Sequence, residues 1–438
     1  MERGEWNSRV GFILATTGSA VGLGNIWRFP YVVGTSGGGA FVLVFTLIMF
    51  LIGIPLMMGE LVLGRASHRN PVGAFKALAP ESSWWLAGLL QVGAGILILS
   101  YYSVIAGWSL AYFFRTARGG FLGLDNQMMA EEFNSLVGAG LQPLLWHAFF
   151  MVVVVVIVIG GISGGIERWS RILVPLFFLL ILFMLYQVLQ LPGAREGLVW
   201  FLRPDISQLN MRILLGAIGQ VFFSLSLGMG AVLTYGSYLS SEENIPENAL
   251  YISLADLVLA LLAGMIIIPA VFAFNLEPDA GPGLIFITLP AIFNQMPGGV
   301  LFGSIFFLFL SIAALTSAIS LLEVVVSYLI DEWKLMRANA ALLAGLAIFL
   351  LGIPSSLSQG RINIFILGYS FLDFADLVAS DIALPLGGLL LTIFIGWKWG
   401  RKEANKELHE FVLAEAWGYL IKYLIPLAMI YVFFSNLI

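Results

Sequence analysis

A few polar residues lie inside segments that are otherwise apolar, and their side chains are the ones best suited to do chemistry. Asp256 lies in the run Leu-Ala-Asp-Leu-Val-Leu-Ala, and its apolar segment contains no basic residue. A carboxylate at that depth needs a proton, a cation or an arginine partner. Thr316 and Ser317 add two hydroxyl groups in the middle of another apolar segment. Carboxylate, hydroxyl and carbonyl oxygens suit a hard cation, and so weakly charged a ligand set favours Na⁺ over Ca²⁺. The simpler alternative is that each hydroxyl bonds the carbonyl one turn back in its own helix.

The apolar segment 9–33 is interrupted at its centre. Gly22-Leu23-Gly24 is followed by Asn25, and Arg28 lies one turn later. Glycine costs about 1 kcal/mol per helical residue relative to alanine, so we expect the helix to unwind there. Breaks of this kind supply carbonyls to cations and a helix N-terminus to an anionic substrate group. The alternative is a small-residue packing face between helices.

A similar interruption occurs in the apolar segment 212–238, where Gly228-Met229-Gly230 parallels the first glycine pair. Broken segments at corresponding positions of two halves indicate a transporter site at the interface of an inverted repeat. The halves show no obvious residue-level identity, and two unrelated packing sites are the alternative.

The composition restricts the class of protein. Of 438 residues, 60% are hydrophobic and 11% are charged, and the mean hydropathy is +0.96. Only a polytopic α-helical membrane protein fits these values. The absence of cysteine excludes a disulfide framework, a thiol nucleophile and a thiolate metal site. Three scattered histidines do not form a metal centre, and no stretch resembles a soluble domain or a nucleic-acid-binding patch.

The apolar segments predict eleven membrane spans, with short surface helices expected in 115–141, 191–211 and 276–298. The spans are 9–33, 39–64, 86–114, 142–161, 170–190, 212–238, 249–275, 299–330, 339–354, 366–396 and 413–436. Most Lys and Arg residues fall on the N-terminal side of the membrane, which predicts a cytoplasmic N-terminus and an extracellular C-terminus. Short terminal segments and the lack of a signal-peptide pattern favour a prokaryotic plasma membrane.

The same residues form motifs that we recognise. They are Gly18-Ser19-Ala20-Val21-Gly22-Leu23-Gly24-Asn25-Ile26-Trp27-Arg28-Phe29-Pro30-Tyr31, then Gly37-Gly38-Gly39-Ala40-Phe41 and Gly53-Ile54-Pro55-Leu56. The chain resembles the neurotransmitter:sodium symporter family, in particular its short, eleven-span prokaryotic members. The resemblance implies the LeuT-type fold, an all-α membrane bundle with broken helices 1 and 6. A single transporter domain, 1–438, would contain inverted repeats 9–190 (spans 1–5) and 212–396 (spans 6–10), and 413–436 would be an additional span 11.

The resemblance also implies the ligands of two sodium ions and a substrate. The first sodium would be bound by Ala20, Asn25, Ser224 and Asp256. The second would be bound by Gly18, Val21, Ala313, Thr316 and Ser317. The substrate would contact Ala20, Leu23, Gly24, Ile98, Tyr102, Ile105, Phe223, Ser226, Met229, Ala318 and Leu321.

Two gates are implied as well. The outer gate would pair Arg28 with Asp376, and Tyr102 with Phe223 would form its lid. The inner gate would pair Arg3 with Asp331, supported by Trp6 and Tyr238. Glu323 is either part of the inner pathway or a solvated helix end.

Several positions depart from the family pattern. Asp256 stands where many relatives carry a neutral asparagine, and Ala260 and Phe45 stand where chloride-dependent relatives carry a serine and a tyrosine. Alanine and phenylalanine provide no donor for a halide, whereas Asp256 supplies a fixed negative charge. We therefore expect transport without chloride, and protonation of Asp256 after sodium release as a route to proton antiport. Met229 replaces a common aromatic residue, and its flexible side chain suits a pocket that accepts several side-chain sizes.

These features predict a sodium-coupled symporter, not an enzyme, that takes up a neutral hydrophobic or aromatic L-amino acid by alternating access. Spans 1, 2, 6 and 7 would rock against a scaffold that includes spans 3 and 8. Its expected partners are the amino acid, two sodium ions and membrane lipid, with no chloride and no nucleic acid, in a monomer or homodimer. The alternatives are a sodium-independent, proton-coupled or exchange permease of the same fold, a channel or substrate-sensing receptor, and, least favoured, an intramembrane enzyme.

Overall fold

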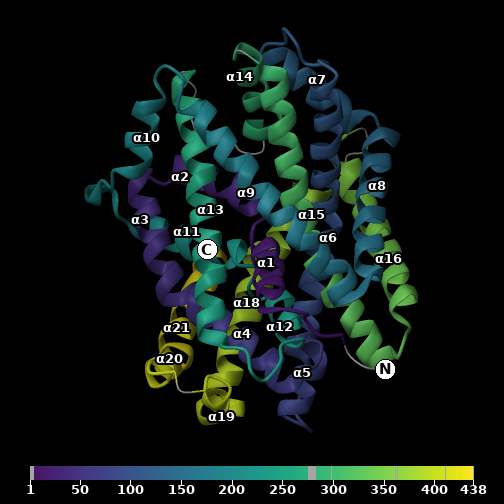
Figure 1. Cartoon of the computed structure of the whole chain (residues 1–438), viewed down its shortest axis with the longest axis vertical. Coiled ribbons are helices and arrows are strands. Elements are labelled where there is room, and N and C mark those ends of the chain that lie inside the picture. Colours follow the sequence, from purple (N-terminus) through teal and green to yellow (C-terminus); the bar gives the residue numbers. More distant parts are fainter. Residues whose placement is uncertain are drawn as a thin grey trace.

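The computed structural model describes residues 4–274, 283–296, 298–360, 362, 364–409 and 411–437, which are almost entirely helical. Figure 1 shows the helices packed side by side in one bundle. In the labels, η marks a short 3-10 or π-helical segment. The first half comprises α1 (Arg9–Ala20), η1 (Gly24–Arg28), α2 (Phe29–Thr35), α3 (Gly39–Ile48), η2 (Met49–Gly53), α4 (Ile54–Ser67), α5 (Pro71–Leu78), α6 (Trp85–Ala117), α7 (Asn126–Gly138), α8 (Leu141–Ile159), η3 (Ile162–Glu167), α9 (Arg168–Val188), α10 (Ala194–Leu202) and η4 (Ile206–Gln208).

The second half carries the only two strands in the part of the chain that the structure describes. It comprises α11 (Met211–Ser224), α12 (Ala231–Gly236), α13 (Ile245–Ala273), η5 (Leu284–Thr288), α14 (Leu289–Gln295), α15 (Gly299–Trp333), α16 (Arg337–Ser358), β1 (Phe365–Ile366), β2 (Tyr369–Ser370), α17 (Phe371–Asp376), η6 (Leu377–Ala383), α18 (Leu384–Ile393), η7 (Phe394–Trp399), α19 (Arg401–Lys406), α20 (Ala414–Tyr419), η8 (Leu420–Leu424) and α21 (Ile425–Leu437).

The helices follow the predicted spans in order. Nine helices among the described residues are long and apolar enough to cross a membrane, and the pair α1 with η1–α2 is one further span bent by 51°. The predicted span 212–238 corresponds to two shorter helices, α11 and α12, interrupted at 225–230. The predicted surface helices correspond to α7, α10 and α14. The predicted end of the seventh span at 275 lies outside the described residues.

The predicted start of the tenth span at 366 is wrong. Residues 365–370 form a two-stranded hairpin, in which Phe365 pairs with Ser370 and Ile366 with Tyr369. The turn at Leu367 and Gly368 has positive φ angles of 51° and 88°, which a helix cannot contain. The helix begins at Phe371, where the Ser370 hydroxyl caps it by accepting a hydrogen bond from the Asp373 amide at 3.2 Å.

The centre of the bundle is built from α6 and α15, which pack against each other along their length (Figure 1). Aromatic side chains fill the space between them, with the Tyr112 and Phe307 ring centroids 5.0 Å apart. The broken helices lie beside this pair, since α15 contacts both α1 and α12. The site is therefore held between two interrupted helices and two long continuous ones.

Candidate functional site

The first predicted break is confirmed. Helix α1 ends at Ala20, and Val21 is extended with φ −78° and ψ 101°. The chain becomes helical again from Gly24. The Asn25 side chain folds back over the break, because its Oδ1 accepts a hydrogen bond from the Gly22 amide at 3.3 Å.

The second break is also present, but it begins at Leu225 instead of at Gly228. Ser226, Gly228 and Gly230 have positive φ angles of 55°, 81° and 76°. A carboxylate from the neighbouring helix satisfies the exposed backbone, since Glu60 accepts hydrogen bonds from the amides of Gly228 at 2.7 Å and Leu233 at 3.2 Å. The sequence analysis missed Glu60, although an acidic residue inside the apolar segment 39–64 was a visible signal.

The residues predicted for the first sodium meet at a fully buried cluster. Asn25 donates to Ser224 Oγ at 3.0 Å and to Asp256 Oδ1 at 2.7 Å. The Ser224 hydroxyl donates to Asp256 Oδ2 at 2.6 Å. All three side chains have no exposed surface. Side-chain oxygens from α13, α11 and the first break therefore lie together in one cluster. The Asp256 carboxylate is the source of negative charge in it.

The residues predicted for the second sodium lie between α1 and α15. The Ser317 hydroxyl donates to the Ser19 carbonyl at 3.0 Å and lies 3.4 Å from the Val21 carbonyl and 3.5 Å from that of Gly18. Thr316 follows the simpler alternative, because its hydroxyl bonds the Ala313 carbonyl of its own helix at 3.0 Å. A cavity of about 10 Å³ borders Gly18, Val21 and Thr316.

The residues predicted for the substrate surround the two breaks. The Tyr102 hydroxyl accepts a hydrogen bond from the Leu23 amide at 3.2 Å, and the Ser226 hydroxyl donates to the Ser19 carbonyl at 2.9 Å. Phe223 packs on Gly24 so closely that a Cβ there would lie 2.5 Å from its ring. The remaining predicted lining residues are all buried: Ile98, Ile105, Met229, Ala318 and Leu321.

The predicted outer gate is not closed by a direct ion pair in this structure. The Arg28 guanidinium lies over the Phe223 ring, 4.9 Å from its centroid. The Asp376 carboxylate accepts hydrogen bonds from the hydroxyls of Tyr101 and Ser380, each at 2.8 Å. Ion pairs between described residues do not include Arg28 with Asp376. Arg28 thus contacts one predicted lid residue, and Asp376 is held by its own neighbours.

The inner gate can be described only in part, because Arg3 lies outside the described residues. Asp331 accepts hydrogen bonds from the amide and the side chain of Asn70 at 2.9 and 3.1 Å. The Trp6 indole donates to the Tyr235 carbonyl at 3.1 Å.

Glu323 is not a solvated helix end. It is fully buried, accepts a hydrogen bond from Tyr238 at 2.7 Å and pairs with Arg337 at 2.5 Å. The alternative in which Glu323 lies in solvent is therefore wrong.

The two positions at which chloride-dependent relatives carry hydroxyls are filled by apolar groups. Phe45 and Ala260 are fully buried. The Phe45 ring packs between two others, with centroids 4.9 Å from Phe29 and 6.2 Å from Phe41. Neither residue offers a hydrogen-bond donor to an anion.

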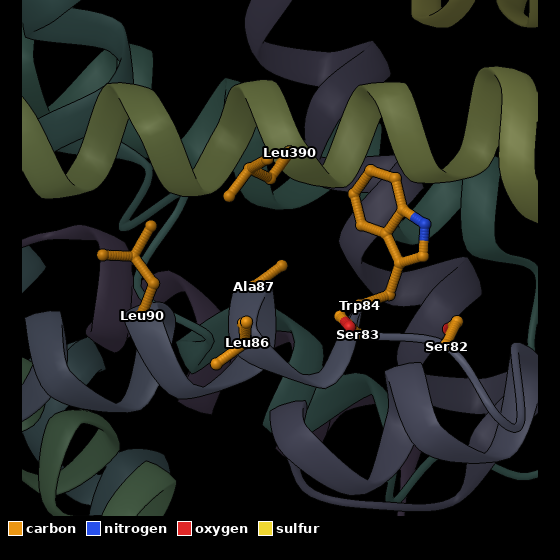
Figure 2. A pocket seen from close by; sticks show the side chains of 7 residues that line it. All are labelled: Ser82, Ser83, Trp84, Leu86, Ala87, Leu90 and Leu390. Carbon is orange, nitrogen blue, oxygen red and sulfur yellow. The ribbon is translucent and has the colours of Figure 1, made fainter.

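A separate pocket of about 360 Å³ lies between the start of α6 and Leu390 of α18 (Figure 2). Its wall is mainly apolar, formed by Trp84, Leu86, Ala87, Leu90 and Leu390, with Ser82 and Ser83 at one end. None of the residues predicted to bind substrate or sodium lines it, so it is distinct from the site at the breaks.

Comparisons with known proteins show the family of the chain. The family model described as the sodium:neurotransmitter symporter family matches residues 3–121 and 128–438. A sodium-dependent transporter of Bacillus subtilis is 42% identical over 437 residues, which cover 98% of this chain and 97% of the relative. A sodium-dependent transporter of Methanocaldococcus jannaschii is 35% identical over 460 residues, covering 100% of this chain and 91% of the relative.

The fold matches a solved structure closely. The crystal structure of MhsT in complex with L-phenylalanine superposes with a TM-score of 0.92 at 44% identity, covering 99% of this chain and 100% of that one. Since MhsT has the LeuT fold, the predicted fold class is confirmed. The chain belongs to the sodium:neurotransmitter symporter family, whose members are sodium-dependent membrane transporters and not enzymes.

Proposed function

We propose that this sodium-dependent transporter is a symporter that takes up a neutral, hydrophobic or aromatic L-amino acid together with two sodium ions. The observation that carries the proposal is the buried cluster of Asn25, Ser224 and Asp256 beside the break in α1. A buried carboxylate with two polar neighbours is a suitable environment for a small hard cation. Ser317, which reaches the carbonyls at the end of α1, supports the second ion.

The substrate class follows from the side chains around the breaks. Ile98, Ile105, Met229, Ala318 and Leu321 are buried and uncharged. Such a wall binds an apolar side chain by removing it from water, at about 25 cal/mol per Å² of buried apolar surface. The similar protein MhsT was solved with L-phenylalanine, which makes this amino acid the first to test. The amides of Leu23 and Gly24 with the Tyr102 hydroxyl would bind its carboxylate, and the oxygens of Ala20, Phe223 and Ser226 its amino group.

Transport is proposed to be independent of chloride. Asp256 supplies a negative charge beside the first sodium, and Phe45 and Ala260 give a halide no donor. After sodium leaves inward, the buried carboxylate would lack a counter-charge, which is costly in a membrane interior. Asp256 therefore binds a proton from the inside when sodium has left, and carries it outward as the empty transporter returns. One proton is thus exported for each sodium ion that enters through this site.

The proposed cycle opens one gate at a time, with the N-terminus cytoplasmic and the C-terminus extracellular in a prokaryotic plasma membrane. The halves 9–190 and 212–396 act as the inverted repeats. Arg28, Phe223, Tyr102 and Asp376 act at the outer gate, and Arg3, Trp6, Tyr238 and Asp331 at the inner one. Substrate and sodium need only shift the balance between existing conformations.

Uptake into proteoliposomes tests the proposal. A panel of radiolabelled amino acids is presented under an imposed inward sodium gradient, with chloride replaced by gluconate and a pH-sensitive dye inside. The expected result is sodium-driven accumulation of hydrophobic or aromatic amino acids in gluconate, with the lumen becoming alkaline. Uptake that requires chloride contradicts the role given to Asp256. If uptake is the same with and without the sodium gradient, the result favours the sodium-independent permease over a symporter.

A further inference from the structure

The ends of the tenth and eleventh spans carry a row of half-exposed aromatic side chains. Trp397, Tyr423 and Tyr419 are 50%, 49% and 53% exposed. The Trp397 and Tyr423 rings meet edge to face at 5.9 Å, and the Tyr423 and Tyr419 rings are stacked at 6.3 Å. Half-exposed Trp and Tyr side chains are typical of the boundary between lipid tails and headgroups.

Two cations are fixed on this aromatic row. The Lys422 ammonium lies 5.6 Å from the Trp397 ring centroid and 5.5 Å from that of Tyr423. The Arg401 guanidinium lies 4.3 Å from the Tyr419 ring centroid. Close packing of the two spans holds Lys422 in place, because a Cβ at Gly396 would lie 3.0 Å from the Lys422 Cα atom.

Lys422 is unusual because it lies within the span 414–434 and forms no ion pair with an acidic residue that the structure describes. The acidic residues described nearby are already paired: Glu403 with Lys406 at 2.6 Å, Glu415 with Arg401 at 3.4 Å, and Glu407 with Arg65 at 2.8 Å. Ion pairs between described residues include neither Lys422 nor the exposed Lys398 and Lys402. A lysine in a span without a counter-charge is costly, so this arrangement calls for an external anion.

An apolar face continues from the aromatic row along α21. Leu424, Leu427, Ile430, Tyr431 and Phe434 are 45%, 65%, 39%, 51% and 57% exposed. Their spacing of three and four residues places them on one side of the helix. A ligand at this surface therefore meets cations at one end and an apolar stripe along the membrane-facing side.

We propose that this surface binds one anionic phospholipid. Its phosphate lies between Lys422 and Arg401, and its acyl chains lie along the exposed face of α21. Charge complementarity selects an anionic headgroup, because basic residues at the end of a span attract anionic lipid. The lipid belongs to the leaflet on the side of α5 and α19, which lie at the same end of the bundle (Figure 1).

Native mass spectrometry of the full-length, delipidated protein tests the proposal. The probes are phosphatidylglycerol and phosphatidylcholine with identical acyl chains, added to the wild type and to Lys422→Gln. We expect the wild type to prefer phosphatidylglycerol, and K422Q to bind it about fivefold more weakly, because one basic residue is lost. Binding of phosphatidylcholine should not change.

Three further variants separate a defined site from general attraction. Lys406→Gln removes the same charge nearby, but Lys406 is 68% exposed and already paired with Glu403. It should leave phosphatidylglycerol binding unchanged. Lys422→Arg should retain the preference, and Trp397→Leu, which keeps the charge but removes the ring, should weaken it.

Equal binding of the two lipids by the wild type would overturn the proposal. So would a K406Q effect as large as that of K422Q, or a lipid-independent dimer that K422Q dissociates, since a second copy would then be the occupant. If K422Q fails to fold, the K422R and W397L results decide the matter, because a lost preference in K422R excludes a cation-dependent site.

Discussion

Replacing Asp256 by asparagine removes one charge from the buried cluster and leaves its shape unchanged. The asparagine oxygen accepts the hydrogen bond that Asn25 now donates at 2.7 Å, and its amide donates to the Ser224 hydroxyl, which rotates to accept. The network therefore survives with neutral hydrogen bonds, each weaker by about 1 kcal/mol than its charged counterpart. We expect D256N to fold, with a modest loss of thermal stability.

The effect on sodium affinity is larger. Two unit charges 4 Å apart attract each other by about 4 kcal/mol at an effective dielectric constant of about 20. Dehydrating the carboxylate offsets part of this attraction. We take about half as the net loss, roughly 2 kcal/mol, which corresponds to about a 30-fold rise in the half-saturating sodium concentration.

The assay is sodium titration of radiolabelled L-phenylalanine binding by purified protein, in chloride and in gluconate. The control is Asp205→Asn, the same change in an exposed loop, where hydrogen bonds from Ser207 and Gln208 lower the pKa of Asp205 and keep it charged. D205N should titrate like the wild type. Unchanged sodium dependence in D256N would refute the assignment of its carboxylate to sodium binding. Restoration of its affinity by chloride would contradict the proposal that Phe45 and Ala260 leave no halide site.

Three other substitutions test separate contacts. Ser317→Ala removes the hydroxyl that bonds the Ser19 carbonyl at 3.0 Å. We expect sodium titration to show about tenfold weaker sodium binding. An unchanged titration would rule out Ser317 as a sodium ligand. Glu60→Gln keeps only one oxygen for the two amides at the second break, so unfolding should show a loss of about 1–3 kcal/mol; a variant as stable as the wild type would show that the break does not depend on this carboxylate. Gly24→Ala places a Cβ 2.5 Å from the Phe223 ring, and such overpacking costs about 1–3 kcal/mol. We expect amino-acid binding to weaken more than the melting temperature falls. Normal binding by the variant would contradict the tight contact between Gly24 and Phe223.

Asp256 and Asn25 could be singled out from the sequence because polar residues are rare inside apolar segments, whereas the full set with Ser224 was implied by the family resemblance. Asn25, Ser224 and Asp256 are far apart in the chain, and each interrupts an apolar segment. A polar group at membrane depth must find a partner, but which residues would meet was implied by the resemblance. The glycine pairs indicated both breaks because glycine is unfavourable inside a helix, although the second break begins before its pair.

Other features depend on tertiary contacts that composition does not encode. In the second break, the amides of Gly228 and Leu233 are satisfied by Glu60 from another helix. Arg28 lies over the Phe223 ring and does not pair with Asp376. Which of these two contacts forms depends on the relative positions of the spans that carry them. The hairpin before α17 contains Tyr369 and Phe365, residues as apolar as those of the span that follows, so hydropathy extended that span too far.

The central claim is that sodium and the amino acid move together through one site. The most direct measurement is parallel uptake of radiolabelled sodium and radiolabelled L-phenylalanine into chloride-free proteoliposomes at a fixed membrane potential. The account predicts that phenylalanine stimulates sodium entry, and that the sodium ions moved per amino acid fall in D256N. Phenylalanine uptake without accompanying sodium entry would contradict it.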